Sequence, residues 1–328
     1  MNPLLEVKRS CNIVCEEASF VRIDAAAIDR VAQEMDVSTI GDKSQVAWDA
    51  EGWHYCEDVP NGPMTCQYIF VLDALNFCFW PSPDDLEYEH LATCLKNVLC
   101  KNSNAFSAES LSNISEDVLQ SWFPNHTIPL ISERVLRLKE MGEVLLKEFA
   151  GLAEGMVVAA NGSAVKLVEL ILRYLPGFRD TVIYKGRLVH LYKRAQILVG
   201  DLWAAYGGRL QETNGTGGNS QYYKFKDMGE LTMFADYRVP QILRQMGVLV
   251  YDPSLASKID QKTLIPFGSE EEVEIRACTI IAVEKLKEAL VKRGRDIIVI
   301  EVDWLLWQLG EKLKDDIPPH HRTLTIYY

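Results

Sequence analysis

Apolar residues recur every three or four positions along most of this chain, and that spacing constrains its fold more than any other feature. Over residues 191–206 the apolar positions keep this period until Gly207 and Gly208 end the pattern. Three further segments share the spacing: residues 132–149, 163–175 and 271–293. Signals typical of strands are few. The sequence therefore predicts a mainly α-helical protein with a few short strands.

Three other segments lead to less regular expectations. Residues 297–302 are rich in β-branched side chains and predict a short strand. Residues 68–79 form an almost uninterrupted apolar run, which predicts either a buried strand or a buried helix. Residues 213–220, TNGTGGNS, are of low complexity and predict a flexible surface loop. Neither an internal repeat nor a clear linker divides the sequence, so we expect a single domain over residues 1–328.

Composition and charge exclude several classes of protein. The 328 residues are 48% hydrophobic and 24% charged, which is typical of a globular protein. A net charge of −12 argues against a protein that tracks along a nucleic-acid backbone. No apolar run is long enough to span a membrane, and the first residues lack the pattern of a secretory signal. We therefore expect a cytoplasmic protein, with a nuclear pool also compatible, whose eight cysteines are reduced thiols.

The sequence contains no motif for a cofactor or a metal ion. There is neither a Walker loop nor a GxGxxG turn between a strand and a helix, so nucleotide-driven or redox chemistry is unsupported. His320 and His321 are adjacent, but no further ligand is spaced to complete a metal site with them. We expect the protein to act without a cofactor or metal.

A single carboxylate, Asp236, interrupts an apolar run just before a predicted helix. Pro240 suits the first turn of that helix, and the apolar residues after it keep helical spacing. An aspartate at this junction lies near the positive end of the helix dipole, which favours its ionised form. Such a carboxylate suits a general base, a nucleophile or a partner for a developing cation. The alternative is an ordinary helix cap.

Several motifs together resemble one known family, the queuosine salvage proteins, which are queuosine 5′-phosphate N-glycosylases. In chain order the motifs are IFVLDALNFCFW (69–80), YKRAQILVGDLW (192–203), MFADYRVPQIL (233–243), EVEIRACTI (272–280), EVDWLLW (301–307) and the final IYY. The resemblance spans nearly the whole chain. It implies hydrolysis of the N-glycosidic bond of queuosine 5′-monophosphate, which releases queuine for re-use in tRNA. The expected partners are these two small molecules, and no nucleic-acid polymer or membrane.

The resemblance also bears on the fold. The segment LPGF (175–178), followed by the predicted helix that carries Asp201, is similar to the hairpin and aspartate of helix-hairpin-helix DNA glycosylases, although Arg179 replaces the usual second glycine. The family resemblance implies a distant kinship with that fold. Within the single queuosine-salvage domain, an alternative division has an N-terminal helical subdomain over about residues 1–125 and a catalytic part over about 126–328.

Charged and aromatic residues near these motifs are candidates for the site. Asp201 is costly in the middle of an apolar helix unless it is paired with a neighbouring arginine or is functional. Lys193, Arg194 and Arg238 could bind a phosphate, although solvated surface positions are the commoner role of such residues. Asp303 beside Trp304 suits a cationic heterocycle, and core packing of Trp304 is the alternative.

The resemblance favours His54 as a base-binding residue, whereas a structural role is commoner for a lone histidine among aromatic residues. Gln308 stands where the family often has a carboxylate, so this chain lacks the negative charge at that position. The predicted catalytic residues are Asp236 and Asp201, and the predicted substrate-binding residues are His54, Lys193, Thr232, Phe234, Tyr237, Arg238, Asp303, Trp304 and Gln308.

Two other functions are alternatives to this one. The first is a DNA or nucleoside glycosylase with a different substrate range, and the acidic net charge disfavours its DNA version. The second is a helical scaffold that binds protein partners without catalysis. Convergence of Asp236, Asp201 and Asp303 on one cavity would disfavour the scaffold.

Overall fold

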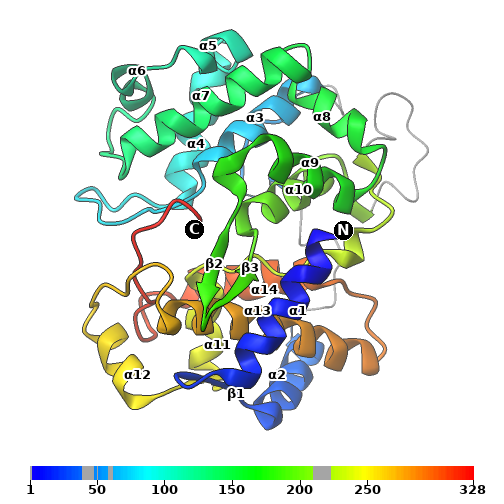
Figure 1. Ribbon diagram of the computed structural model, residues 1–328, viewed down its shortest axis with the longest axis vertical. Coiled ribbons are helices and arrows are strands. Elements are labelled where there is room, and N and C mark those ends of the chain that lie inside the picture. Colours follow the sequence, from blue (N-terminus) through cyan, green and yellow to red (C-terminus); the bar gives the residue numbers. More distant parts are fainter. Residues whose placement is uncertain (1, 39–47, 50, 58–61, 210–222) are drawn as a thin grey trace.

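A computed structural model describes residues 2–38, 48–49, 51–57, 62–209 and 223–328, and it is mainly helical (Figure 1). The expected loop at 213–220 lies outside the described residues. Among the described residues, no helix combines the length and apolar character that a membrane span requires. The helices are α1 (Pro3–Glu17), α2 (Ala25–Ser38), α3 (Pro63–Leu75), α4 (Tyr88–Lys101), α5 (Ala108–Ser112), α6 (Glu116–Ser121), α7 (Ile131–Glu148), α8 (Ala153–Ala160), α9 (Ala164–Tyr174), α10 (Lys193–Ala205), α11 (Arg238–Gln245), α12 (Pro253–Asp260), α13 (Glu270–Lys292) and α14 (Val299–Leu313).

Two antiparallel strand pairs complete the fold. Strand β1 (Val21–Ile23) pairs with β4 (Leu249–Tyr251), and β2 (Thr181–Tyr184) pairs with β3 (Arg187–His190). Lys185 and Gly186 join β2 to β3, and their φ angles of 47° and 78° suit the tight turn of a hairpin. This hairpin separates the short 3₁₀ helix Pro176–Phe178 from α10, so the LPGF segment does not lead directly into the helix that carries Asp201.

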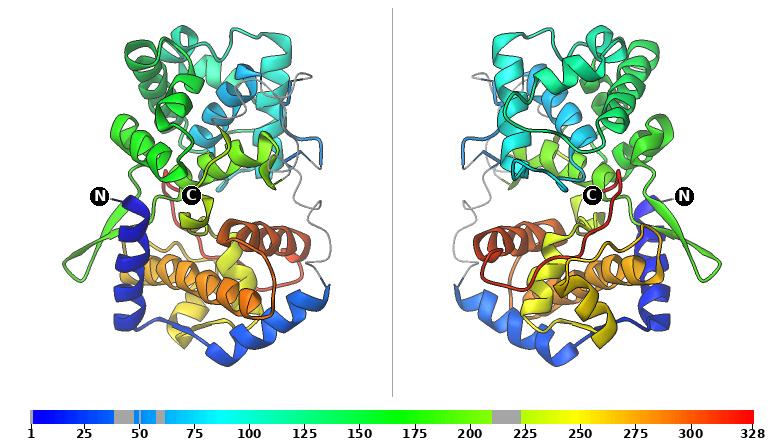
Figure 2. Two further views of the ribbon diagram at one scale, coloured as in Figure 1. Left: turned by 90° about the vertical axis from the view of Figure 1, so that its right-hand side faces the viewer. Right: turned by 90° about the vertical axis from the view of Figure 1, so that its left-hand side faces the viewer.

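The buried apolar residues form two hydrophobic cores. The first consists mainly of side chains from α3 to α10, joined by Leu4 of α1 and Ile300 of α14. The second contains side chains from α1, α2, both strand pairs and α11 to α14. Figures 1 and 2 show α5 to α8 at one end of the molecule and α2 and α12 at the other. Helices α1 and α2 pack against α13 although they lie far from it in sequence. The first helices of the chain therefore belong with its last ones.

The apolar run over residues 68–79 is mostly helix rather than strand. It forms the greater part of α3, which begins with Pro63 and ends at Leu75. Every residue from Thr65 to Leu75 is buried, because the first core surrounds the helix on all sides. A helix buried all round has no polar face, so periodicity could not distinguish it from a buried strand.

The predicted strand over residues 297–302 is wrong, because these residues lead into α14. Glu301 caps the helix: its carboxylate accepts a hydrogen bond from the amide of Ile298 at 2.9 Å. The β-branched residues Val299, Ile300 and Val302 are buried against the two cores. Packing and the cap therefore outweigh the β propensity of these side chains.

Candidate active site

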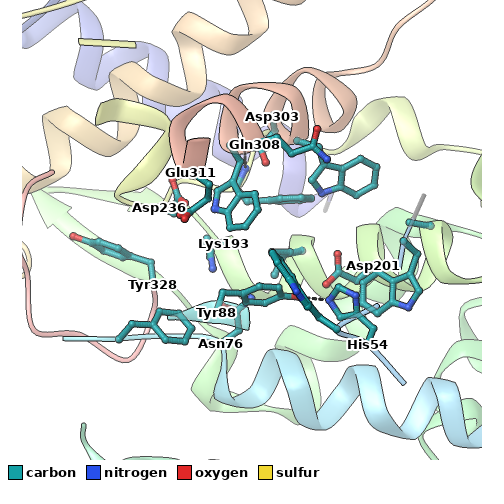
Figure 3. Close-up of a pocket in the computed structure, with 18 of the residues that line it drawn as sticks. His54, Asn76, Tyr88, Lys193, Asp201, Asp236, Asp303, Gln308, Glu311 and Tyr328 are labelled. Carbon is teal, nitrogen blue, oxygen red and sulfur yellow. Dashed lines mark hydrogen bonds between the residues drawn. The ribbon is translucent and has the colours of Figure 1, made fainter. Parts of the chain in front are cut away.

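A cavity of about 640 Å³ lies where α10, α14 and the segment before α11 meet the segments next to α3 and α4 (Figure 3). Its walls are largely aromatic, and its polar groups include several carboxylates and one lysine. The lining residues are Trp48, Glu51, Trp53, His54, Asn76, Phe79, Tyr88, Lys193, Ile197, Asp201, Ala204, Phe234, Asp236, Tyr237, Asp303, Trp304, Trp307, Gln308, Glu311 and Tyr328.

All but two of the predicted site residues line this cavity. The exceptions are Thr232 and Arg238. The Thr232 hydroxyl lies 2.9 Å from the side-chain nitrogen of Gln196, in the buried interior. Arg238 donates hydrogen bonds to Glu311 and to Gln241, each at 2.6 Å. Both side chains are therefore held by other protein groups, and Arg238 contacts the lining residues Glu311 and Tyr237 without lining the cavity itself.

Arg194, the third candidate cation, also points away from the cavity. Its guanidinium is fully buried and donates to the backbone carbonyls of Asp73, Ala74 and Gly177. These bonds join α10 to the end of α3 and to the turn after α9. Of the three cations proposed to bind a phosphate, only Lys193 lines the cavity.

Asp236 lies two residues before α11, next to the helix that the sequence predicts there. Its Oδ1 accepts a hydrogen bond from the amide of Val239 at 3.0 Å, and the residue is 8% exposed. Burial raises the pKa of the carboxyl above its ordinary value, although Lys193, the Val239 amide and Arg238 lower it. The start of the helix does favour the charge, but desolvation is the larger effect, so the net shift is opposite to the one expected from the dipole.

Asp201 lies on α10, and its Oδ2 has no hydrogen-bond partner among the described residues. No arginine in the described part of the chain forms an ion pair with Asp201, so the alternative of a structural Asp–Arg pair is not found. Burial, and then the nearby carboxylate of Asp73, raise the pKa of Asp201 well above its ordinary value. The acid therefore holds its proton to a higher pH than an exposed aspartate does.

Asp303 supports the cavity from α14. Its Oδ1 accepts a hydrogen bond from the backbone amide of Phe234 at 3.1 Å, which connects α14 to the segment before Asp236. Burial, and then the charge of Asp236, raise the pKa of Asp303 well above its ordinary value. The charge of Asp236 therefore disfavours ionisation of Asp303, and the charge of Asp303 disfavours ionisation of Asp201.

Lys193 is the first residue of α10, and its backbone amide donates to Asp180 Oδ2 at 3.2 Å. Its side chain is buried, which lowers the pKa of the amine, and Asp236 is the foremost of the carboxylates that raise it. Figure 3 shows Lys193 below Asp236, with Asp201 and His54 toward the other end of the cavity. The two ends of the cavity therefore differ: the Lys193 amine lies at one end, and the Asp201 acid, with its raised pKa, lies toward the other.

Both ring nitrogens of His54 lie close to polar groups of the protein. Its ring stacks on Trp48 with 4.1 Å between centroids, and Nε2 lies 2.9 Å from the Tyr88 hydroxyl. Asp49 Oδ1 lies 3.4 Å from Nδ1. Burial lowers the pKa of His54 to about 4, so the ring is neutral at pH 7. Its predicted contact with a base stays a prediction, and the Tyr88 hydroxyl is a second polar group at this position.

Aromatic rings form two walls. Trp304 lies 6.4 Å from Phe234 and 6.2 Å from Trp203, between ring centroids, and Trp307 meets Tyr88 edge-on at 6.0 Å. Gly200 allows this packing, since an added Cβ would come within 2.9 Å of the Phe234 ring. Flat aromatic walls suit a flat heterocycle.

Some lining residues were absent from the predicted site. Trp307 and Glu311 follow Asp303 at helical spacing, so extending that helix face by two turns could have found them. Asn76 interrupts the apolar run of residues 68–79 and Tyr328 ends the IYY motif, so both had a sequence signal. Trp48, Trp53 and Tyr88 come from other segments, and no local sequence signal marks them as cavity residues.

Replacing Asp201 with asparagine is expected to stabilise the fold at neutral pH by on the order of 1 kcal/mol, a common gain where a functional site is relieved of strain. The folded state raises the pKa of Asp201, so this carboxyl contributes stability at low pH that is lost as the pH rises through its folded pKa. The neutral amide avoids that loss. Thermal unfolding should therefore show a Tm gain at about pH 8 that shrinks by about pH 5.

Asp227 provides the matched control for this measurement. Its carboxylate accepts hydrogen bonds from the Ser163 hydroxyl and the Ala164 amide, each at 2.6 Å, and it lies outside the cavity. Asp227→Asn should lower the Tm, because it removes a satisfied acceptor. A Tm loss in Asp201→Asn as large as that in Asp227→Asn would contradict the assignment of Asp201 as a strained cavity acid.

Comparisons with known proteins place these features in one family. The model of the queuosine salvage protein family matches residues 55–328. The chain is 43% identical to the queuosine 5′-phosphate N-glycosylase/hydrolase of Dictyostelium discoideum over 335 residues, covering 100% of both chains. It is 40% identical to the Sphaerobacter thermophilus protein of that name, over 96% of this chain and 95% of the relative. The protein of that name from Bos taurus is 31% identical, over 100% of both chains.

Proposed function

Because the chain belongs to the queuosine salvage protein family, we propose that it hydrolyses the N-glycosidic bond of queuosine 5′-phosphate and releases queuine for salvage into tRNA. One observation carries the proposal: Asp236, Asp201 and Asp303 converge with Lys193 on one cavity between aromatic walls. Buried carboxylates are costly unless they are paired or used. A non-catalytic scaffold has no need for them.

The proposed reaction breaks the bond between C1′ of the ribose and the ring nitrogen of the base, and water supplies the oxygen that C1′ gains. Positive charge builds on the ribose in the transition state, and the Asp236 carboxylate is our choice for stabilising it or activating the water. The Val239 amide, Lys193 and Arg238 all favour the ionised form that this role requires. One proton of the water stays on the new C1′ hydroxyl, and the other goes to the ring nitrogen of the departing base.

The leaving base needs a different group. Queuine is a 7-deazapurine, so the base has no N7 to protonate, and any help must reach another edge of the ring. The raised pKa of Asp201 supports a role as a proton-bearing acid that donates a hydrogen bond there. Asp303 and Trp304 are the proposed partners of the cationic side chain and the flat ring, with Phe234, Tyr237, Gln308 and His54 completing the base site.

The proposal extends to the phosphate and to the domain. Lys193 is the proposed phosphate contact, because its buried amine faces the Asp236 end of the cavity. We also propose that residues 1–328 form one domain, since the cavity is lined by Phe79 and Phe234 of the first core and by Trp307, which packs against the second. A distant kinship with helix-hairpin-helix glycosylases stays part of this proposal, supported by the position of Asp201 on the helix after the LPGF turn and the hairpin.

Product analysis tests the function. The purified protein is incubated separately with queuosine 5′-phosphate, queuosine, AMP and a DNA duplex, and the products are separated and weighed by mass spectrometry. Reaction in ¹⁸O water should place one heavy oxygen on the released ribose 5-phosphate and none on queuine. Base release from AMP at the same rate would favour the broader glycosylase, abasic DNA would favour the DNA glycosylase, and the absence of any product would leave the scaffold.

A further inference from the structure

Arg276, on α13, is fully buried and forms a three-way junction behind the cavity. Its Nε donates to the backbone carbonyl of Ala235 at 3.1 Å. Its two terminal nitrogens donate to the two oxygens of Asp180, at 3.0 and 2.5 Å. The side chain does not line the cavity. Every donor edge of the guanidinium is therefore directed at a fixed acceptor.

Each acceptor holds the backbone at or next to a residue that lines the cavity. Ala235 directly precedes Asp236, whose carboxylate caps α11. Asp180 Oδ2 also accepts the backbone amide of Lys193, the first residue of α10, at 3.2 Å. The Asp180 carbonyl accepts the preceding amides of Leu191 and Tyr192 at 3.0 and 3.2 Å. One side chain thus connects the backbone at Asp236 with the backbone at Lys193.

The same junction reaches a third cavity residue. Glu272, one turn before Arg276, lies 3.5 Å from its guanidinium and accepts the Tyr328 hydroxyl at 3.0 Å. The Tyr328 ring, which lines the cavity, lies 4.4 Å from the guanidinium carbon. The buried cation is therefore enclosed by two carboxylates, a carbonyl and an aromatic face.

We infer that Arg276 is a positioning residue that fixes the Asp236 carboxylate relative to the Lys193 amine. A planar guanidinium offers parallel donors to a carboxylate and a further donor at a set angle, which a lysine ammonium does not reproduce. A buried ion pair of this kind adds little net stability over apolar packing, so its value lies in the geometry it specifies. This inference rests on the proposed function, because it assigns the geometry to that reaction.

A double-mutant cycle between Arg276 and Asp236 tests the inference. Arg276→Lys keeps the charge but loses the fork, and small displacements of reacting groups cost up to about 100-fold in rate. We expect the single-turnover rate on saturating queuosine 5′-phosphate to fall about 10- to 100-fold in the otherwise unchanged protein. In the Asp236→Asn background, Arg276→Lys should lower the single-turnover rate less than about 3-fold, because the carboxylate that Arg276 positions is already gone.

Glu274→Gln is the matched control. Glu274 lies on the same helix, is fully buried, and accepts hydrogen bonds from the amides of Ser19, Phe20 and Val21, away from the cavity. Its substitution should destabilise the fold and change the rate by the same factor in both backgrounds. Queuine binding, followed by tryptophan fluorescence, should be nearly unchanged in Arg276→Lys.

Equal rate losses from Arg276→Lys in the two backgrounds, or no loss in either, would overturn the positioning role. If Arg276→Lys does not fold, Asp180→Asn replaces it in the cycle and the same criterion applies, because Asp180 is the other half of the junction. Failure of the proposed function is a different result. In that case the protein without any substitution would release no queuine from queuosine 5′-phosphate.

Discussion

Replacing Asp236 with asparagine is expected to lower the single-turnover rate of queuosine 5′-phosphate cleavage by at least about 100-fold. The amide keeps the size of the side chain and an oxygen for the Val239 amide, but it removes the negative charge opposite the developing cation. Because the carboxylate is buried, it acts in a medium of low polarity, where the loss of its charge weighs more than it would in water. Single-turnover kinetics, thermal unfolding and queuine binding should be measured on the same preparation.

Asp252 offers a matched control for the capping role. It is the N-cap of α12, its Oδ1 accepts the Ser254 amide at 2.9 Å, and a proline follows it, yet it lies outside the cavity. Asp252→Asn should leave the cleavage rate unchanged. If Asp236→Asn behaves like Asp252→Asn, or loses activity only because it unfolds, Asp236 is a helix cap and the catalytic proposal is wrong.

Replacing Lys193 with methionine is expected to lower kcat/KM for queuosine 5′-phosphate by about 10- to 100-fold, the scale of one lost hydrogen bond to a charged group. The loss for the free nucleoside queuosine should be much smaller, because that substrate has no phosphate to pair with the amine. Methionine preserves the apolar stem, and the Asp180 contact survives because it uses the backbone amide of residue 193. Steady-state kinetics on both substrates provide the measurement.

Comparing the loss of activity on queuosine 5′-phosphate with that on queuosine distinguishes two roles for Lys193. If the amine serves Asp236 rather than the phosphate, its removal raises the pKa of that carboxyl further and lowers kcat on both substrates equally. Arg238→Met is a useful comparison, because Arg238 pairs with Glu311 and does not line the cavity. It should affect the two substrates to the same degree. The phosphate assignment fails if Lys193→Met gives that same pattern.

Sequence periodicity predicted most of the long helices because their apolar side chains recur at helical spacing where they pack into the cores. Residues 191–206 and 271–293 correspond closely to α10 and α13. Residues 68–79 show no helical period that separates a helix from a strand, since α3 is buried on every side. The β-branched residues of 297–302 predicted a strand, but their burial and the Glu301 cap favour a helix. In both places tertiary packing, which a local pattern does not contain, decides the structure.

The site was predictable to the extent that it consists of polar interruptions in apolar segments. Asp201, Asp236 and Asp303 are such interruptions, and all three line the cavity. Proximity in sequence to Asp236 was a weaker guide, because neighbours such as Thr232 and Arg238 point elsewhere. Their roles were inferred without knowledge of side-chain direction. The pKa of Asp236 depended on burial in three dimensions, so the helix dipole alone gave the wrong sign.

The packing of α1 and α2 against α13 has a consequence for synthesis on the ribosome. Cys15 on α1 and Cys278 on α13 lie 3.3 Å apart between sulfurs but are separated by 263 residues. The first helices therefore emerge long before the helix that buries their apolar faces, whereas α3 to α10 can pack against one another as they appear. Until α13 is synthesised, α1 and α2 expose the apolar surface that it later covers, and a chaperone bound there would protect it.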